Sequence, residues 1–369
     1  MISGYLCKYK YHICVVSFAL FLFAPAILFL IFKDSLDTTD YEKRTKAPKP
    51  VISITGLPGF PDAFNDYYSD HLPFRNELIG LNSKVDYYIF GDSPSDRVVF
   101  GDDGWLFYTG AAIDTSTGKT MLTDDELKTI STNLQTANDY FRTQGIEFLL
   151  FIAPNKETVY RDKLPKYYPV ISDISIGQQL VDYLRANTDI NVVWPYDDIS
   201  KESKEYYTYC HLDTHWNNIG SYIGAGSAAD ALDAPMLPLD KHTVTPVSYS
   251  RGDLSDLMHL ILKDRDTDYN ISGYEDPGYP VEQFYGEFME FHNESGDERT
   301  VVMRRDSYGI RLSRYLSGQF NDMYVMTSDS PMDTIEMFDA DVFIYEVVER
   351  NAEDIRINLP EITSGVINE

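Results

Sequence analysis

Cysteine is scarce in this sequence. The 369 residues include 3 cysteines, of which Cys7 and Cys14 lie near the N-terminus and Cys210 is alone in the rest of the chain. A single thiol cannot form an intrachain disulfide, so the folded body must be stabilised by its hydrophobic core. Hydrophobic residues make up 43% of the chain and aromatic residues 14%, which is enough for a large core.

Basic residues are also few relative to acidic ones. Lys and Arg total 31 against 58 for Asp and Glu, which gives a formal net charge of -27. So acidic a surface repels phosphate backbones, and we expect no nucleic-acid partner. The sequence has no internal repeat and no low-complexity tract. Its length suits one large α/β domain with insertions, or two domains.

Charge is absent altogether from residues 13–32, a run of 20 residues. At about 1.5 Å per helical residue, this run spans roughly the 30 Å hydrocarbon core of a bilayer. It therefore predicts a membrane-spanning helix. A cleaved signal peptide is the alternative, but the run is long for one, and no small-x-small cleavage site follows it.

The predicted anchor divides the chain into three parts. Residues 1–33 would be a cytoplasmic tail and the anchor, because the tail is too short to hold a domain. Residues 34–56 are charged, contain proline and lack a hydrophobic period, which is typical of a solvated tether. Residues 57–369 would then be the extracytoplasmic part of a single-pass protein of the cell membrane.

Short apolar runs and helical patterns alternate through this last part. The runs lie at 146–154, 190–194, 300–303, 323–326 and 341–348. They predict a mainly parallel sheet of about five strands between helices, an α/β fold. A helix is also expected from Phe74, a hairpin at 97–108, and a helix that a capping box opens at Thr123. Residues 236–295 interrupt the alternation and indicate an insertion.

Two serines stand in motifs that suggest a nucleophile. Ser307 lies between the apolar strand 300–303 and residues with helical spacing, where a sharp turn exposes a hydroxyl beside helix amides. Ser93 belongs to a Gly-Asp-Ser tripeptide, but a helix precedes it, Pro94 follows it and a hairpin comes next. We therefore expect Ser307 to be the nucleophile and Ser93 to bond backbone in a turn.

A serine nucleophile needs a base and usually an orienting carboxylate. Asp213 and His215 are two residues apart, just before a helix rich in small residues that begins near Asn217. A carboxylate so placed can hold one imidazole nitrogen and leave the other to accept the serine proton. With Ser307, they predict a catalytic triad.

The same neighbourhood permits two other chemistries. His211, Asp213 and His215 are residue types that bind zinc or iron, although one short loop offers three ligands and no obvious fourth. Cys210 could be a thiol nucleophile beside His211, but adjacent side chains tend to point apart and a buried inert cysteine is commoner. We expect no bound metal and no cofactor.

These residues resemble a known family. Asp213-Thr-His215-Trp-Asn217 and Arg305-Asp-Ser307-Tyr-Gly309 are similar to motifs of the alginate O-acetyltransferase proteins of the AlgJ/AlgX type, close to the DHHW proteins. The similarity covers about residues 57–352. Supporting matches are "VVFGDDGWLFY", "APNKETVYRDKLP", "RGDLSDL" and "YEVVERN". The resemblance implies an SGNH-hydrolase-like, flavodoxin-like fold in which the Asp-x-His pair precedes the serine.

The resemblance also implies roles for individual residues. Ser307 would be the nucleophile, His215 the general base and then acid, and Asp213 its orienter. An oxyanion would be held by the Ser307 amide, with Gly309, Arg305 and Asn155 as further candidates. The reaction would be an acetyl transfer through an acetyl-serine, with the acetyl group supplied by a membrane-bound O-acyltransferase.

We therefore expect an anchored extracytoplasmic O-acetyltransferase that modifies a cell-surface polysaccharide. A carbohydrate O-acetyl esterase with the same triad is the alternative, because water can replace the sugar hydroxyl. A glycan-binding or assembly scaffold without activity is the second. At a net charge of -27 the chain is poorly suited to polyanionic alginate, so a neutral or amino-sugar polymer is expected.

Overall fold

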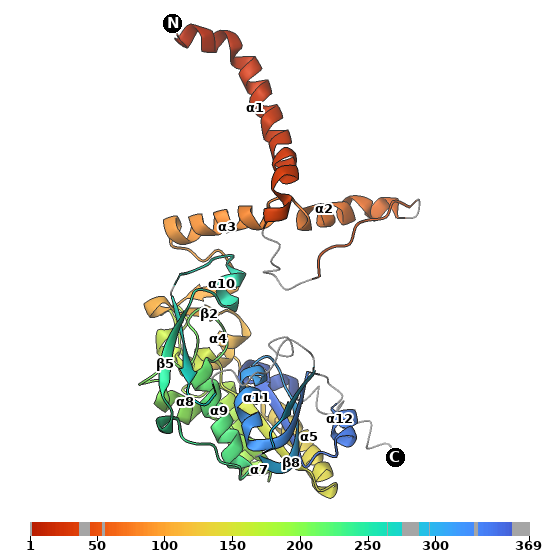
Figure 1. Ribbon diagram of the computed structural model, residues 1–369, viewed down its shortest axis with the longest axis vertical. Coiled ribbons are helices and arrows are strands. Elements are labelled where there is room, and N and C mark those ends of the chain that lie inside the picture. The colour runs from red at the N-terminus through yellow and green to blue at the C-terminus, as the bar shows by residue number, and fades with distance from the viewer. Residues whose placement is uncertain are drawn as a thin grey trace. The chain divides into compact units, whose positions relative to one another are not determined.

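The computed structural model describes residues 2–36, 45–53, 56–263, 265–274, 288–294, 296–327 and 331–355. Parts of the predicted tether and of the predicted insertion lie outside these residues. The chain divides into two compact units, Met1–Ser95 with Asp256–Leu260 and Asp96–Ser255 with Ile261–Glu369 (Figure 1). Both proposed boundaries, of the tether and of the insertion, stay predictions.

The regular secondary structure of the first unit, over the described residues, is helical. It contains the α-helices α1 (Ile2–Phe32), α2 (Phe60–Asp70) and α3 (Arg75–Val85). Short helical turns, labelled η, are the 3₁₀ helices η1 (Lys33–Ser35) and η2 (Leu57–Gly59) and the π-helix η3 (Asp86–Phe90). The helix predicted from Phe74 is confirmed as α3, whereas α2 was not predicted.

The predicted anchor, residues 13–32, belongs to α1. Over the described residues, no helix combines the length and the apolar character that crossing a membrane requires. The membrane-spanning role of this segment therefore stays a prediction.

The second unit is built on a sheet of six strands in the order β4-β3-β10-β8-β9-β7. The five predicted strands all form and pair in parallel. The sixth strand, β7, lies within the predicted insertion and pairs antiparallel to β9. The bounds are β3 (Glu147–Ala153), β4 (Asn191–Val193), β7 (Phe288–His292), β8 (Asp297–Arg304), β9 (Phe320–Met326) and β10 (Val342–Val348). The predicted α/β class is confirmed.

Alternate residues of the central strands enter two separate cores. In β3, Leu149 and Phe151 pack on the side that also buries Leu312, whereas Phe148 and Leu150 pack on the other. Such two-sided burial produces the nearly unbroken apolar runs in the sequence, because neither strand face meets water. Helices α9 (Asn218–Ala231) and α11 (Gly309–Leu316) cover the first face, and α5 (Asp124–Thr143) and α7 (Ile176–Asn187) the second.

Shorter elements surround this sheet. The hairpin of β1 (Val98–Phe100) and β2 (Leu106–Tyr108) forms as predicted, with Asp103 in the left-handed region at φ 57°. Thr123 and Glu126 close the predicted capping box of α5. The other segments are η4 (Asp102–Gly104), α4 (Ala111–Ser116), α6 (Lys156–Val159), η5 (Arg161–Lys163), α8 (Tyr196–Glu202), η6 (Leu239–Lys241), β5 (Val244–Tyr249), α10 (Asp253–Leu257), β6 (Asp266–Ile271), η8 (Ser317–Gln319), α12 (Met332–Met337) and η9 (Glu349–Asp354).

Helix α9 follows directly on the loop that carries His215, and its first turn is closely packed. Asn217 caps the helix by accepting bonds from the amides of Ile219 and Gly220. A Cβ atom at Gly220 would overlap the carbonyl oxygen of Thr208, which is backbone and cannot rotate away. The start of α9 therefore depends on glycine at this position.

We expect Gly220→Ala to lower the free energy of unfolding by about 1–3 kcal/mol, as overpacking does in other interiors. The matched control is Gly226→Ala in the same helix, where a Cβ atom meets nothing within 4 Å. That change should be neutral or stabilising by up to about 1 kcal/mol, because alanine favours the helix. Denaturant unfolding measures both, and equal effects would refute the packing argument.

Candidate active site

Ser307 lies in the turn between β8 and α11, at the carboxyl edge of the sheet, and it is exposed. The side chain of Asp306 shapes this turn. Its carboxylate accepts the amides of Tyr308 at 2.8 Å and Val348 at 2.7 Å, which ties the turn to the end of β10. The Asp306 amide in turn donates to Glu346 Oε2 at 2.9 Å. The nucleophile candidate is thus presented by a rigid turn.

Gly309 begins α11 and is buried beneath this turn. A Cβ atom there would come within 2.5 Å of the Arg305 Cβ and 2.8 Å of Glu346 Oε2. Glycine is therefore required by packing inside the protein, whatever the residue does toward a substrate.

Asp213 and His215 form a compact turn of their own. Asp213 Oδ1 accepts the His215 amide at 3.0 Å and bonds to the His215 Nδ1 at 2.6 Å. Asp213 Oδ2 accepts the amide of Asp253 at 2.9 Å. With its orientation set by Asp213, the imidazole directs Nε2 to Ser307 Oγ, 2.8 Å away. The three predicted triad residues are therefore within hydrogen-bonding distance in the expected order.

The charges of three neighbouring groups decide where protons reside. Burial alone would raise the pKa of Asp213, but the charge and hydrogen bonds of His215 hold it well below its usual range. Burial opposes a charged imidazole, yet the charge and hydrogen bond of Asp213 outweigh it and raise the pKa of His215. Burial together with the Asp213 charge raises the pKa of Asp253 to about 6. Asp213 is thus the carboxylate that stays ionised.

Asp253 was not predicted as a site residue, although it lies in the "RGDLSDL" stretch. Its carboxylate accepts the Thr214 amide at 2.7 Å and the Thr214 hydroxyl at 2.5 Å. Its Oδ2 lies 3.6 Å from His215 Nδ1, too far for a hydrogen bond but close enough to act by charge. A separation of 40 residues from Asp213 hides this relation in the sequence.

Tyr308 joins the two halves of the site. Its hydroxyl donates to the Thr214 carbonyl at 2.6 Å, and its own carbonyl accepts the Trp216 Nε1 at 3.2 Å. Its ring lies 4.9 Å from the His215 ring. Arg350 adds a bond to the Tyr308 hydroxyl at 3.3 Å. The residue after Ser307 therefore fixes the loop that carries His215.

Lys156 is a second residue that sequence reasoning missed. Its side chain is fully buried, and Nζ donates to the carbonyls of His211 at 3.0 Å and Asp213 at 2.9 Å. The ammonium lies over the Trp105 and Phe107 rings, at 5.1 and 5.4 Å from their centroids. Burial lowers the pKa of Lys156. Its bonds to the two backbone carbonyls tie down the loop that carries Asp213 and satisfy the buried Nζ.

Asn155 and Arg305, two candidates for holding an oxyanion, form hydrogen bonds with other groups of the protein. Asn155 Nδ2 donates to the hydroxyls of Thr115 and Ser116, and Asn155 Oδ1 accepts the backbone amide of Arg350. Arg305 is buried and donates from Nη1 to the Asp306 carbonyl at 3.2 Å. These bonds stabilise the site's surroundings, and an oxyanion role for either side chain stays a prediction.

Two sets of residues in this region are of types that can bind a metal ion. The His211 ring lies 4.0 Å from the Trp105 ring at an inclination of 32°, and its Nδ1 lies 3.6 Å from Asp266 Oδ1. A different group, Asp213, His215 and Asp253, has possible ligand atoms within 4.8 Å of one another, but His215 Nδ1 is already bonded to Asp213.

The other candidate nucleophiles also have structural surroundings. Burial raises the pKa of Cys210 well above its ordinary value and so keeps the thiol protonated. The Ser93 hydroxyl donates to the Ser95 carbonyl at 2.8 Å in the first unit, the backbone contact expected of a turn residue.

The family model described as "SGNH hydrolase-like domain, acetyltransferase AlgX" matches residues 98–271. This match confirms the resemblance to the AlgJ/AlgX type. It contains Asp213, His215 and Asp253 but ends before Ser307, so the nucleophile is argued from geometry. A comparison with curated protein sequences gives no match.

Several solved structures of low sequence identity are similar to this chain. Bacillus cereus PatB1 is 12% identical, with 69% of this chain and 96% of that chain covered at a TM-score of 0.53. PatB1 with a sulfonyl adduct is 13% identical, with 69% and 97% covered at 0.51. The O-acetyltransferase domain of Pseudomonas putida AlgJ is 16% identical, with 72% and 99% covered at 0.46. The family match and the two PatB1 structures support an SGNH-hydrolase-like α/β fold.

If His215 is the base, the rate of acetyl-enzyme formation should rise with pH as the imidazole loses its proton. The raised pKa puts the midpoint of this rise above about 6.5, the ordinary histidine value. Asp213→Asn removes the charge that raises this pKa and leaves burial, which lowers it. The midpoint should then move to lower pH, and kcat should fall by about 10⁴-fold. A pH profile of kcat/KM with a small acetyl ester measures the midpoint, and kcat at saturating ester measures the fall.

Asp253→Asn is the matched control for that profile. It removes a charge 3.6 Å from Nδ1 without removing a bond to the imidazole. We expect a shift in the same direction but smaller, with kcat lowered by less than about tenfold. The order of these two effects would be reversed if Asp253, rather than Asp213, oriented the base.

Proposed function

We propose that this protein is an O-acetyltransferase that moves acetyl groups onto hydroxyls of a cell-surface polysaccharide, with Ser307, His215 and Asp213 as its triad. The observation that carries the proposal is the 2.8 Å contact between His215 Nε2 and Ser307 Oγ, made while Nδ1 bonds to Asp213. The acetyltransferase family match over residues 98–271 supports the acetyl group as the one transferred.

In the first half of the reaction, His215 Nε2 accepts the proton of the Ser307 hydroxyl as Oγ attacks the carbonyl carbon of an acetyl ester. Asp213 stabilises the imidazolium that forms. When the tetrahedral intermediate collapses, the bond to the donor oxygen breaks and His215 returns the proton to that oxygen. An acetyl group remains as an ester on Ser307.

In the second half, a sugar hydroxyl takes the place of the departed donor. His215 accepts its proton, the sugar oxygen attacks the acetyl carbonyl, and Ser307 Oγ leaves and recovers a proton from the imidazolium. The exposed position of Ser307 supports this step, because a polymer cannot enter a closed cavity. The raised pKa of His215 suits a residue that must both accept and return protons.

The acceptor polymer is proposed to be neutral or to carry amino groups. At a net charge of -27, the protein would repel a polyuronate unless basic residues gathered at the site. We further propose that residues 13–32 anchor the protein and that a membrane-bound O-acyltransferase supplies acetyl groups outside the cytoplasm. The uncharged sequence of that segment supports the anchor.

The test compares two serines that both stand in Asp-Ser motifs. With a small acetyl ester such as 4-nitrophenyl acetate, the intact mass of the wild-type chain should increase by one acetyl group. Ser307→Ala should show no acetylation, because it lacks the attacking oxygen, whereas Ser93→Ala should behave as the wild type. Acetylation of the Ser307→Ala chain at wild-type rate would refute the triad.

A second assay adds glycan acceptors to the acetylated protein and follows both products. Acetyl groups on the glycan are the expected result. Release of free acetate with no acetylated glycan would identify an esterase instead. Retention of glycan acetylation in cells that carry Ser307→Ala would favour a scaffold role.

A further inference from the structure

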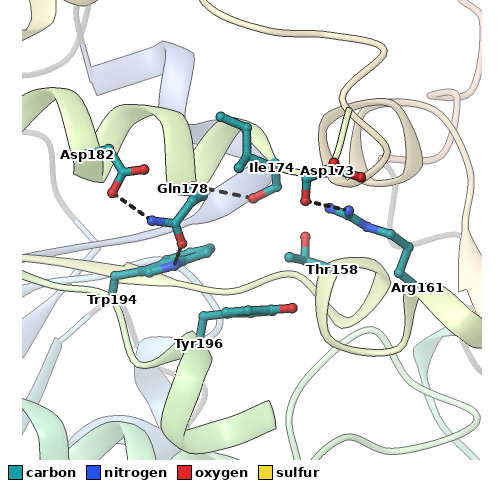
Figure 2. Close-up of a pocket in the computed structure, with 9 residues that line it drawn as sticks. Thr158, Arg161, Asp173, Ile174, Gln178, Asp182, Trp194 and Tyr196 are labelled. Carbon is teal, nitrogen blue, oxygen red and sulfur yellow. Dashed lines mark hydrogen bonds between the residues drawn. The ribbon is translucent and has the colours of Figure 1, made fainter. Parts of the chain in front are cut away.

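A cavity of about 240 Å³ opens beside the carboxyl ends of β3 and β4, separate from the triad (Figure 2). Its wall comes from α6, the connection to α7, α7 itself and the start of α8. The volume is below the roughly 300 Å³ at which pockets for drug-sized ligands begin. It therefore suits one ring-sized group of a larger molecule. None of its lining side chains takes part in the proposed triad chemistry.

Two aromatic rings form one wall of this cavity. Trp194 and Tyr196 have ring centroids 5.9 Å apart and planes inclined by 16°. In Figure 2 the two rings lie along one side of the space, and Ile174 lies on the opposite side. The electron-rich face of an aromatic ring attracts the weakly positive C–H groups of a flat ring. Such a wall is suited to the C–H face of a pyranose.

Polar groups surround the aromatic wall. Gln178 accepts the Trp194 Nε1 at 3.1 Å and donates to Asp182 at 2.8 Å, which fixes both side chains. Asp173 and Asp182 are exposed carboxylates on the rim, and Arg161 is the one basic residue of the lining. Carboxylates accept bonds from hydroxyl or ammonium groups, and the acidic excess disfavours a ligand that carries a carboxylate.

The cavity and the triad share one edge of the sheet. In the strand order, β4 is three positions from β8, which corresponds to about 14 Å at about 4.8 Å per strand. Glu349 links the two regions: it accepts the Thr158 hydroxyl at 2.6 Å and the Gly177 amide at 3.3 Å, and its neighbour Arg350 bonds to Tyr308. An oligosaccharide spans this distance, whereas a single sugar does not.

We propose that this cavity is a binding subsite for one sugar ring without a carboxylate, belonging to the same glycan chain that is acetylated at Ser307. The inference rests on the proposed function for the identity of the polymer. The cavity holds a sugar several units away from the reacting hydroxyl. It would thereby select a neutral or amino-sugar polymer and fix which unit meets the acetyl-serine.

Binding can be measured without turnover, because the chain has 3 tryptophans and only Trp194 lines the cavity. Trp105 and Trp216 are 1% and 0% exposed, and Trp194 is 8% exposed. The full-length Ser307→Ala chain would be titrated with tetramers of glucose, N-acetylglucosamine, glucosamine and mannuronate while tryptophan fluorescence is recorded. At least one of the first three should give a saturable change, which Trp194→Phe should abolish. Mannuronate should give none.

Tyr196 supplies the matched pair of variants. Tyr196→Ala removes the ring and should weaken binding of the responding tetramer about tenfold, the size expected for one aromatic contact. Tyr196→Phe keeps the ring and should bind as the wild type. With an active Ser307, the Tyr196→Ala change should raise the KM for that tetramer by a similar factor and leave kcat nearly unchanged.

The outcomes separate this inference from the proposed function. Acetylation of wild-type Ser307 by a small ester tests the function alone. If the acetyl-enzyme forms but Tyr196→Ala keeps the wild-type KM, the subsite is wrong and the function stands. Absence of a response to all three tetramers without carboxylates, or an equal response to mannuronate, would also overturn the subsite. Binding without acetyl-enzyme formation would instead support the glycan-binding scaffold.

Discussion

The negative charge of the half-buried Asp213 is the constraint on which the rest of the site depends. A carboxylate that is partly shielded from water needs hydrogen-bond donors, and this one receives the amides of His215 and Asp253 and the imidazole Nδ1. Those three bonds determine the path of the loop, and Lys156 holds the same loop from below through its carbonyls. The nearby carboxyl of Asp253, in contrast, has a pKa raised to about 6, because a second negative charge is costly there.

The proposed nucleophile and base come from segments 92 residues apart, and contacts around Tyr308 connect these segments. Its hydroxyl and carbonyl bond to the segment that contains Thr214 and Trp216, on either side of the base. A displacement of Tyr308 would therefore be passed to the loop that carries His215 as well as to Ser307. Their 2.8 Å contact depends on this coupling more than on the conformation of either side chain.

Much of this architecture could be predicted because its signals are local. A strand buried on both faces produces an apolar run, and the turn at Ser307 follows such a run directly, so five strands and the nucleophile candidate could be read from periodicity. Asp253 and Lys156 could not be found in this way, because they reach His215 and Asp213 only through the tertiary fold. Strand β7 was missed for a similar reason: its five residues pair with β9 from within a segment that seemed to interrupt the pattern.

Strand β7 also affects how readily copies of the protein associate through their sheet edges. Open sheet edges are templates on which another chain can add a strand. Here one edge is β4, which has only three residues, and the other is the short antiparallel β7, whose outward positions include Glu290 and His292. Both edges are thus poor templates, so copies of the protein are disfavoured from pairing edge to edge even at high local concentration.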